Sequence, residues 1–275
     1  AIFDVASLTK PVATATALAL LVCSGEVDLD DRVGNTTLGE LAIHQSGISV
    51  PIAWTDVYQL DAISAEALYE LVEHDRYESQ TEYSNAGYAI LGVRLQELTG
   101  RGLDDWMRGQ LWERLGMHDT SFTPSPSRSV PVDKSQSPGR PFDPLADYMV
   151  QQTAHQSALQ PGHSGLFSTA GDLSIFAQFL MSVHDSVPNE TVTCYSDLMI
   201  LQFEGTNRTL AFQIDERGGL YHTGYTGCAM WFEPNSKTSV VLLTTMGHDS
   251  PQEFENLWRD VVSEVRRNTI ERKQE

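Results

Sequence analysis

The sequence is short of basic residues, of cysteines and of long apolar runs. Lysine and arginine together number 18 against 37 acidic residues, for a formal net charge of -19. Nucleic-acid binding needs a basic surface to match the phosphates, so this charge excludes a nucleic-acid partner and disfavours docking to an anionic membrane. The apolar run from Val12 to Val22 is broken by threonines and is too short to cross a bilayer, which predicts no membrane span.

The three cysteines are too few, and odd in number, for a fully paired disulfide framework. Cys23 lies in the apolar run and is interpreted as a small core residue. Cys228 is more typical of a structural residue than of a reactive one. No spacing of cysteine and histidine resembles a zinc site, so the sequence implies neither a metal nor another cofactor.

The 275 residues suffice for a substantial core, and 41% hydrophobic content is ordinary for a globular protein. Apolar periodicity predicts helices through most of the chain, with Gly25, Gly100 and Gly116 as C-terminal stops, and an antiparallel meander after residue 208. Helices are expected at Pro11–Ser24, Ser64–His74, Ser84–Thr99, Leu103–Leu115, Ala170–His184 and Pro251–Asn268, and strands at Thr209–Ile214, Gly219–His222, Cys228–Glu233 and Thr238–Thr245.

This layout predicts an α/β (α+β) fold in which an antiparallel sheet is flanked by helices and carries an inserted, mostly helical lobe. We expect a single domain over residues 1–275. Residues 1–24 and about 205–275 would form the sheet lobe, and about 25–200 the helical lobe. Residues 123–144 are rich in proline and serine and predict a long loop.

Ser7 and Lys10 stand three positions apart, a spacing that places both side chains on one face of a helix. An amine held beside a hydroxyl can take its proton and make the oxygen a nucleophile. Pro11 is tolerated only in the first turn of a helix, so Ser7 is expected at or near the helix N-terminus. Such a pair alone is common and weak.

Two further triplets strengthen the interpretation. Tyr83-Ser84-Asn85 supplies a phenol and an amide just before a predicted helix, and His222-Thr223-Gly224 ends a predicted strand. With Ser7 and Lys10, in this order, they resemble the serine β-lactamase and penicillin-binding-protein superfamily. Residues 41–48 and 162–173 extend the resemblance, which covers Phe3 to about Val265. It is greatest for the class C-like branch, which includes class C β-lactamases, D-alanyl-D-alanine carboxypeptidases and esterases.

The resemblance implies a role for each residue. Ser7 would be the nucleophile, with Lys10 or Tyr83 as the base, and Asn85 would bind substrate and help to hold Lys10. His222 would contact Tyr83 or a substrate carboxylate, and it should titrate within the usual assay range. Thr223 and Gly224 would line the substrate site, with Gly224 leaving room for the substrate backbone. The backbone N–H groups of Ser7 and Tyr225 would form the oxyanion hole.

The sequence thus predicts a serine hydrolase that forms an acyl-enzyme on Ser7 and acts on a small-molecule ester, peptide or β-lactam. Esters rank first, D-alanyl peptides second and β-lactams third, because histidine at 222 is mostly neutral at pH 7. The alternative is a non-catalytic binding or sensor domain of the same fold. Neither compartment nor oligomeric state can be inferred.

One expectation concerns the sheet. Family members carry strands ahead of the serine motif, whereas only residues 1–6 precede Ser7 here. The apolar run Val240 to Leu243 is typical of a strand covered on both faces, and an uncovered edge there would favour aggregation. The resemblance therefore implies that the N-terminal strands are missing, and that another segment or a partner chain completes the sheet.

Overall fold

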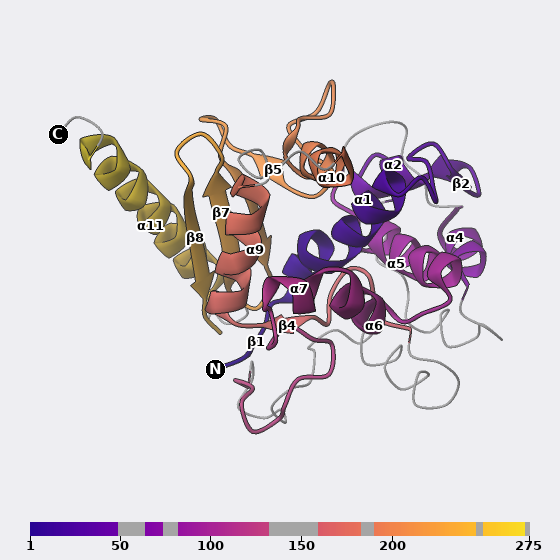
Figure 1. The fold of residues 1–275 in the computed structure, drawn as a ribbon, viewed down its shortest axis with the longest axis horizontal. Helices are drawn as coiled ribbons and strands as arrows, with labels where there is room; N and C mark the ends of the chain where they lie inside the picture. Colours follow the sequence, from indigo (N-terminus) through magenta and orange to yellow (C-terminus); the bar gives the residue numbers. More distant parts are fainter. Residues whose placement is uncertain (49–63, 74–81, 132–158, 183–189, 246–249, 273–275) are drawn as a thin grey trace.

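The computed structural model describes residues 1–48, 64–73, 82–131, 159–182, 190–245 and 250–272. The helical segments are η1 (Ala6–Leu8), η2 (Lys10–Ala15), α1 (Thr16–Cys23), α2 (Leu38–Ala42), α4 (Ala65–Glu73), α5 (Asn85–Thr99), α6 (Leu103–Met107), η3 (Arg108–Trp112), α7 (Glu113–Leu115), α9 (Ala170–Ser182), α10 (Glu190–Ile200) and α11 (Pro251–Arg272). The strands are β1 (Phe3–Asp4), β2 (Arg32–Val33), β3 (Thr36–Thr37), β4 (Phe167–Ser168), β5 (Gln213–Ile214), β6 (Leu220–Gly224), β7 (Cys228–Glu233) and β8 (Thr238–Leu243). Helices α1, α2, α4, α5 and α6 lie on one side of the molecule, and the main sheet lies on the other with α11 at its outer face (Figure 1).

The predicted mixture of helices and an antiparallel sheet is confirmed. The main sheet has the order β5-β6-β7-β8, and each neighbouring pair is antiparallel. Side chains alternate along β7, so that Ala229 and Trp231 pack with α11 while Met230 and Phe232 join the main core. Helices α11 and α9 accordingly cover opposite faces of β7 and β8 (Figure 1).

Both faces of β8 are covered, as its apolar run predicts. Val240 and Leu242 pack with the α11 cluster, and Val241 and Leu243 with the main core. Among the described residues β8 pairs only with β7 and forms the edge of the sheet. The expectation that another segment or chain continues the sheet stays a prediction.

The C-terminal helix was predicted as an amphipathic helix packed on the core. Phe254, Trp258 and Val262 are buried against the sheet, as expected. The i, i+3, i+4 spacing of apolar residues in Pro251–Asn268 also predicts that Leu257 lies on this face, but Leu257 is 38% exposed, so that part of the prediction is wrong. Leu257 lies one position before Trp258 and therefore points about 100° away from it around the helix axis.

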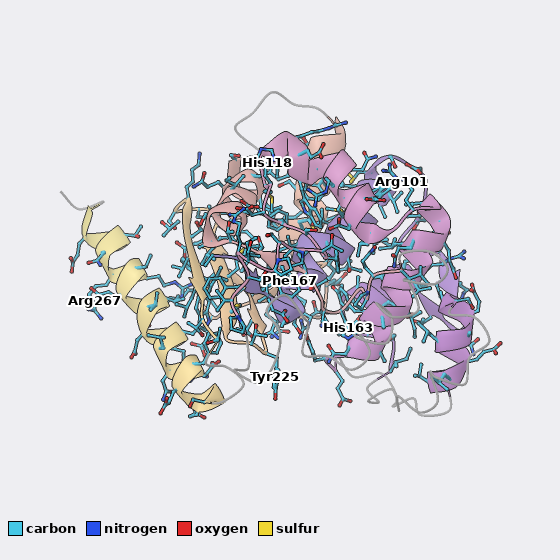
Figure 2. The ribbon with its side chains drawn as sticks, turned by 90° about the horizontal axis from the view of Figure 1, so that it is seen from below. Arg101, His118, His163, Phe167, Tyr225 and Arg267 are labelled. Atoms are coloured by element: carbon cyan, nitrogen blue, oxygen red, sulfur yellow. A yellow bond between two sulfur atoms is a disulfide. The ribbon has the colours of Figure 1, made fainter. Side chains whose placement is uncertain are left out.

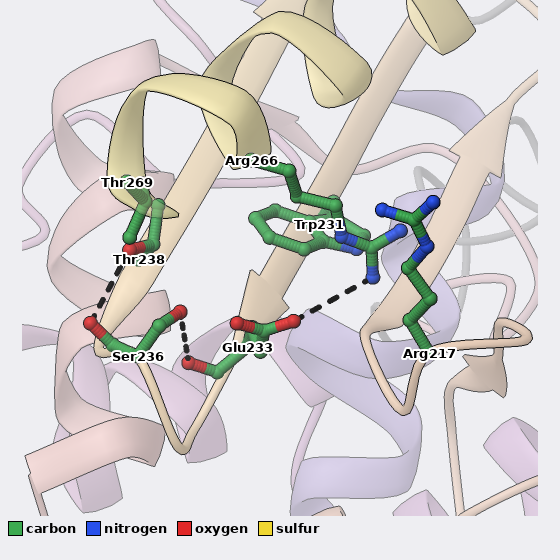
Figure 3. Close-up of a pocket in the computed structure, with 7 residues that line it drawn as sticks. All are labelled: Arg217, Trp231, Glu233, Ser236, Thr238, Arg266 and Thr269. Atoms are coloured by element: carbon green, nitrogen blue, oxygen red, sulfur yellow. Dashed lines mark hydrogen bonds and ion pairs between the residues drawn. The ribbon is translucent and has the colours of Figure 1, made fainter. Parts of the chain in front are cut away.

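Polar contacts also hold α11 to the sheet. The guanidinium of Arg266 contacts Asp215 at 2.8 Å and Glu233 at 3.7 Å, and it lies 4.8 Å from the ring centroid of Trp231. Arg266, Glu233 and Trp231 line a pocket of about 100 Å³ between α11 and the β7–β8 turn (Figure 3). None of the predicted site residues lines it.

The segment Ala6–Cys23 is one continuous buried rod, formed by η1, η2 and α1 in turn. Pro11 lies in the first turn of η2, where its missing N–H costs no hydrogen bond. The 18 residues of Ala6–Cys23 are long and apolar enough to cross a membrane, unlike the shorter run from Val12. However, 78% of this segment is buried inside the protein, as is usual for a core helix.

The predicted helices are found, and glycines end three of them. Gly25, Gly100 and Gly116 have φ values of +76°, +64° and +80°, a left-handed conformation that suits glycine at a helix C-terminus. Among the helices in the described part of the chain, α2 and α10 were not predicted. The start of α2 carries a capping box in which Thr37 and Glu40 bond each other's backbone N–H, a signal that could have revealed it.

The strand expected before β6 and the loop expected after α7 differ in how the structure bears on them. The strand expected at residues 209–214 is reduced to β5, because the Thr209 side chain accepts hydrogen bonds from the backbone N–H groups of Ala211 and Phe212 and closes a turn there. The expected loop at residues 123–144 is irregular from Thr123 to Pro131, and the rest lies outside the described residues.

Cys23 is not the unpaired core residue that the sequence predicts. It forms a disulfide with Cys194 that links the C-terminus of α1 to α10. The two residues are 171 positions apart, so no local spacing could reveal the pair. Cys228 is the buried free cysteine, in agreement with the structural role expected for it.

Candidate active site

Ser7 is presented on a strained turn between β1 and η2. The preceding residue, Ala6, has φ +46°, which is unfavourable for any residue with a Cβ. The strain is held by Asp4, whose carboxylate accepts the Ala6 N–H at 2.8 Å, and by Thr9, whose hydroxyl donates to the Ala6 carbonyl at 2.6 Å. Such strain persists only where the surroundings impose it, and it is common at functional sites.

Lys10 is completely buried, and its ammonium points at Ser7. The Lys10 Nζ atom donates to Ser7 Oγ at 3.2 Å and to Asn85 Oδ1 at 2.8 Å. A third bond, to the backbone carbonyl of His163 at 2.9 Å, was not foreseen from the sequence. The structure thus brings together three of the predicted site residues, Ser7, Lys10 and Asn85, and the last of these comes from α5.

Tyr83 closes the same cluster from the segment just before α5. Its ring centroid lies 4.8 Å from Lys10 Nζ. Although 39% of the side chain is exposed, burial of the hydroxyl end raises the pKa of Tyr83 to about 12. A hydrogen bond with Ser7 and the charge of Arg208 act in the opposite direction. The phenol is therefore protonated at neutral pH.

His222 lies beside Tyr83, with 6.2 Å between ring centroids, but it does not titrate as the sequence predicts. The side chain is 5% exposed, and its Nδ1 donates to the Thr223 carbonyl at 2.8 Å. Burial, followed by the charge of Lys10, lowers the pKa of His222 to about 3. The imidazole is neutral throughout the usual assay range, which corrects the expected charge change near pH 6.5.

The end of β6 meets the serine turn backbone to backbone. A Cβ on Gly224 would lie 2.5 Å from the Val5 carbonyl oxygen, so the glycine is required by this contact, whereas the sequence suggested room for substrate. Thr223 is half-buried in β6, and Tyr225 is 60% exposed and projects outward in Figure 2. The close approach brings the end of β6 against the turn that carries Ser7.

Two buried residues that the motif analysis did not assign complete the cluster. Arg208 makes no side-chain hydrogen bond or ion pair within the described part of the chain, and its charge influences Tyr83 and His222. His44 stacks on Tyr83 with 4.6 Å between ring centroids. Arg208 belongs to no motif, so nothing in the sequence pointed to it. His44 lies within residues 41–48, a stretch that extends the family resemblance, so the sequence did give a signal for it.

The profile of the family described as Beta-lactamase matches residues 1–263. The chain belongs to the beta-lactamase family. Among curated relatives, an N-acetylmuramyl-L-alanine amidase of Bacillus subtilis is 24% identical, and the match covers 93% of this chain and 71% of the amidase. A putative D-alanyl-D-alanine carboxypeptidase of Escherichia coli is 22% identical, covering 94% and 72%. A solved class C β-lactamase has the same fold, with a TM-score of 0.71 at 16% identity and coverage of 95% and 83%.

Membership of the beta-lactamase family confirms the resemblance found in the sequence and indicates a hydrolase of this fold. The family match spans Ser7, Tyr83 and His222, the positions that carry the three motifs.

Proposed function

We propose that the protein is a serine hydrolase that forms an acyl-enzyme on Ser7. The observation that carries this proposal is the contact between the buried Lys10 ammonium and Ser7 Oγ. A binding or sensor domain of the same fold would have no need to bury a lysine against a strained serine, because burying a charged group is costly unless it is bonded. The intact cluster therefore favours an enzyme.

The proposed reaction runs in two halves. Ser7 Oγ attacks the substrate carbonyl while its proton passes to the Lys10–Tyr83 pair, and the backbone N–H groups of Ser7 and Tyr225 stabilise the oxyanion. The bond to the leaving group breaks, and the leaving group takes up the proton. Water then attacks the acyl-Ser7 carbonyl, gives a proton to the same pair and releases the acid and free Ser7.

The structure bears on which member of the pair accepts the first proton. A phenol with a pKa of about 12 is protonated at neutral pH and must lose its proton before it can act as a base. Lys10 already contacts Ser7, and its bonds to Asn85 and the His163 carbonyl hold the nitrogen in place. To accept a proton, Lys10 must first lose one: as a neutral amine it donates to Asn85 and to the His163 carbonyl, and its lone pair takes the Ser7 proton. We favour Lys10 in this form as the direct acceptor, with Tyr83 giving its own proton to the leaving group and taking up the one from Lys10.

Arg208 supports a substrate that carries a carboxylate. Among the described residues the Arg208 guanidinium has no anionic partner, which is unusual for a buried arginine, and an arginine fork matches a carboxylate in two parallel hydrogen bonds. Since His222 is neutral, the positive charge near the third motif comes from Lys10, which is bonded within the site, and from Arg208. This observation supports a D-alanyl-type peptide with a free C-terminus, and we therefore propose that class ahead of the esters ranked first from sequence.

A neutral ester is the second candidate. Tyr83 and Tyr225 are both partly open to solvent, and Ser7 is half-buried, so a small uncharged ester would reach the nucleophile without any ionic contact. A β-lactam keeps the third place that it has from the sequence, although Arg208 could bind its carboxylate as well.

The nucleophile is tested by covalent labelling. A fluorophosphonate or penicillin should modify the protein once, on the peptide that contains Ser7, and Ser7→Ala should abolish both labelling and turnover. Ser24→Ala, a serine at the far end of α1, is the matched control and should behave as wild type. Hydrolysis by Ser7→Ala within about tenfold of wild type would contradict the proposal, because covalent catalysis contributes far more than that.

The substrate class is tested with a matched pair, a D-alanyl peptide with a free carboxylate and the same peptide as its C-terminal amide. Arg208→Gln should lower kcat/KM on the free acid by about 10- to 100-fold, as expected for the loss of a charge-assisted bond, and leave the amide unchanged. Arg217→Gln, which removes an exposed arginine, is the control. Equal losses of kcat/KM on both peptides would favour a neutral ester as the substrate.

A further inference from the structure

His44 forms hydrogen bonds with the backbone on both sides of Tyr83. Its carbonyl oxygen accepts the N–H of Glu82 at 3.1 Å, and its ring nitrogen Nδ1 accepts the N–H of Ser84 at 3.0 Å. One residue thus holds the two peptide groups that flank the phenol. A regular strand would bond both of these groups through its own backbone, whereas here a side-chain nitrogen replaces one of the acceptors.

The same ring packs against the face of Tyr83. The two ring centroids are 4.6 Å apart, and on its other side the His44 ring lies 5.0 Å from Tyr88. Tyr88 is fixed in turn, because its hydroxyl donates to the carbonyls of Ala42 at 2.8 Å and Leu210 at 3.3 Å. Tyr83 therefore rests on a buried wall whose own position is determined by the core.

The local backbone is arranged to make this contact. His44 follows α2 with φ +61°, a left-handed conformation that histidine adopts more readily than most residues. This conformation turns the chain at the end of α2 while the side chain remains 2% exposed beneath Tyr83. A residue that only filled the core would need neither this conformation nor an acceptor nitrogen.

The contact requires a neutral imidazole, since a protonated Nδ1 cannot accept a hydrogen bond. Burial, followed by the charges of Arg208, Lys10 and His222, lowers the pKa of His44 well below its usual value, and the bond from Ser84 acts in the opposite direction. Tyr83 and Tyr88, the other groups that face the ring, are uncharged at neutral pH.

We propose that His44 is a positioning residue for the Ser7 site, which holds Tyr83 and the start of α5 so that the phenol and Asn85 face Lys10. The inference rests on the proposed function of Ser7, Lys10 and Tyr83. It assigns to His44 no contact with substrate. Its effect on the reaction passes through Tyr83 and through Asn85, whose side-chain oxygen bonds Lys10 at 2.8 Å.

Two substitutions separate the acceptor from the bulk of the ring. His44→Asn places an amide oxygen near the position of Nδ1 and tolerates the left-handed conformation, whereas His44→Phe keeps a ring of similar size without an acceptor. We expect His44→Phe to lower the rate of Ser7 acylation on the order of 10²-fold, the effect of a misplacement of about 1 Å, with little change in KM. His44→Asn should recover most of the rate.

A double-mutant cycle tests whether the effect passes through Tyr83. In a Tyr83→Phe background, His44→Phe should cost much less than it does in wild type, because the group that it positions is gone. Tyr195→Phe, which removes a buried hydroxyl in α10 far from this contact, is the control for general destabilisation and should leave the acylation rate unchanged. Equal rates for His44→Phe and wild type, or failure of His44→Asn to recover more than His44→Phe, would overturn the proposal.

Amide hydrogen exchange provides a readout that does not depend on chemistry. Exchange at Ser84 should accelerate in His44→Phe and return toward wild type in His44→Asn, whether or not Ser7 forms an acyl-enzyme. Unchanged exchange at Ser84 would overturn the positioning role even if activity fell. The proposed function would instead be contradicted if Ser7 were not labelled in the wild type. Accelerated exchange at Ser84 in His44→Phe would then still support the role of His44 in holding the backbone.

Discussion

Breaking the bridge between Cys23 and Cys194 should destabilise the protein by several kilocalories per mole. The disulfide closes an interval of 171 residues, for which the chain-entropy model gives roughly 5 kcal/mol at 25 °C. Measured effects of disulfides are typically about 2–4 kcal/mol, and both cysteines are only partly buried, so their loss adds little cavity cost. In a chain of this size, such a loss corresponds to a fall in Tm on the order of 5–15 °C.

The assay is thermal unfolding with and without dithiothreitol. Reduction should lower the Tm of the wild type to that of a variant carrying both Cys23→Ala and Cys194→Ala, and the variant itself should not respond to the reductant. Cys228→Ala is the matched control, since it removes the buried free cysteine and should keep the full response to dithiothreitol.

Thiol counting gives the result that would refute this reasoning. The unfolded, unreduced wild type should show one reactive thiol per chain and the reduced protein three. Three thiols without reductant, or a Tm indifferent to dithiothreitol, would show that the bridge is absent or does not constrain the fold. If the bridge is present, it favours an oxidising compartment, because disulfides are rare in reducing ones.

Three further outcomes are expected. His222→Asn should leave the acidic limb of the kcat/KM profile in place above pH 5, since the pKa of His222 is already about 3, and a displaced limb would contradict this. Burial raises the pKa of Asp215, but the hydrogen bonds that it accepts from Arg266 and neighbouring N–H groups lower the pKa overall. The Asp215–Arg266 pair therefore stabilises the fold above about pH 4, and this contribution is lost as pH falls through the lowered pKa. Arg266→Ala should therefore cost about 1–3 kcal/mol in urea unfolding at pH 7, with a smaller difference from wild type at pH 3; an equal difference at both pH values would contradict it. Gly224→Ala should lose at least about 1 kcal/mol of stability, together with most activity, because its Cβ would overlap the Val5 carbonyl, and a fully active variant would show that the two segments can separate.

The sequence predicts those parts of the fold that local patterns determine. The helix at Asn85–Thr99 has a polar N-cap in Ser84 and a glycine stop at Gly100, and both signals are short-range. By contrast, α10 was missed because its sequence is rich in threonine and buries few large residues, among them Tyr195 and Met199. Its position depends on packing against α1 and on the bridge to Cys23, which no local window contains.

The candidate site divides in the same way. Ser7, Lys10 and Asn85 could be named in advance because each belongs to a short motif, and the structure brings the three within hydrogen-bonding distance. The backbone carbonyl of His163 could not, since the bond to Lys10 uses no side chain and spans 153 positions. Burial cannot be read from a motif either, which is why the sequence assigned His222 an ordinary pKa.

Residue 222 cannot be interpreted apart from Arg208. From the sequence, histidine in the third motif argued against a substrate carboxylate, because the positive charge of a lysine was missing. In the structure His222 is buried and neutral within reach of two cations, Lys10 and Arg208, and their charges help to keep it unprotonated. A lysine at 222 would add a third buried positive charge to this space, and burying like charges together is costly. A neutral histidine is thus what a site with a buried arginine requires, and the charge that the motif lacks is supplied from another segment of the chain.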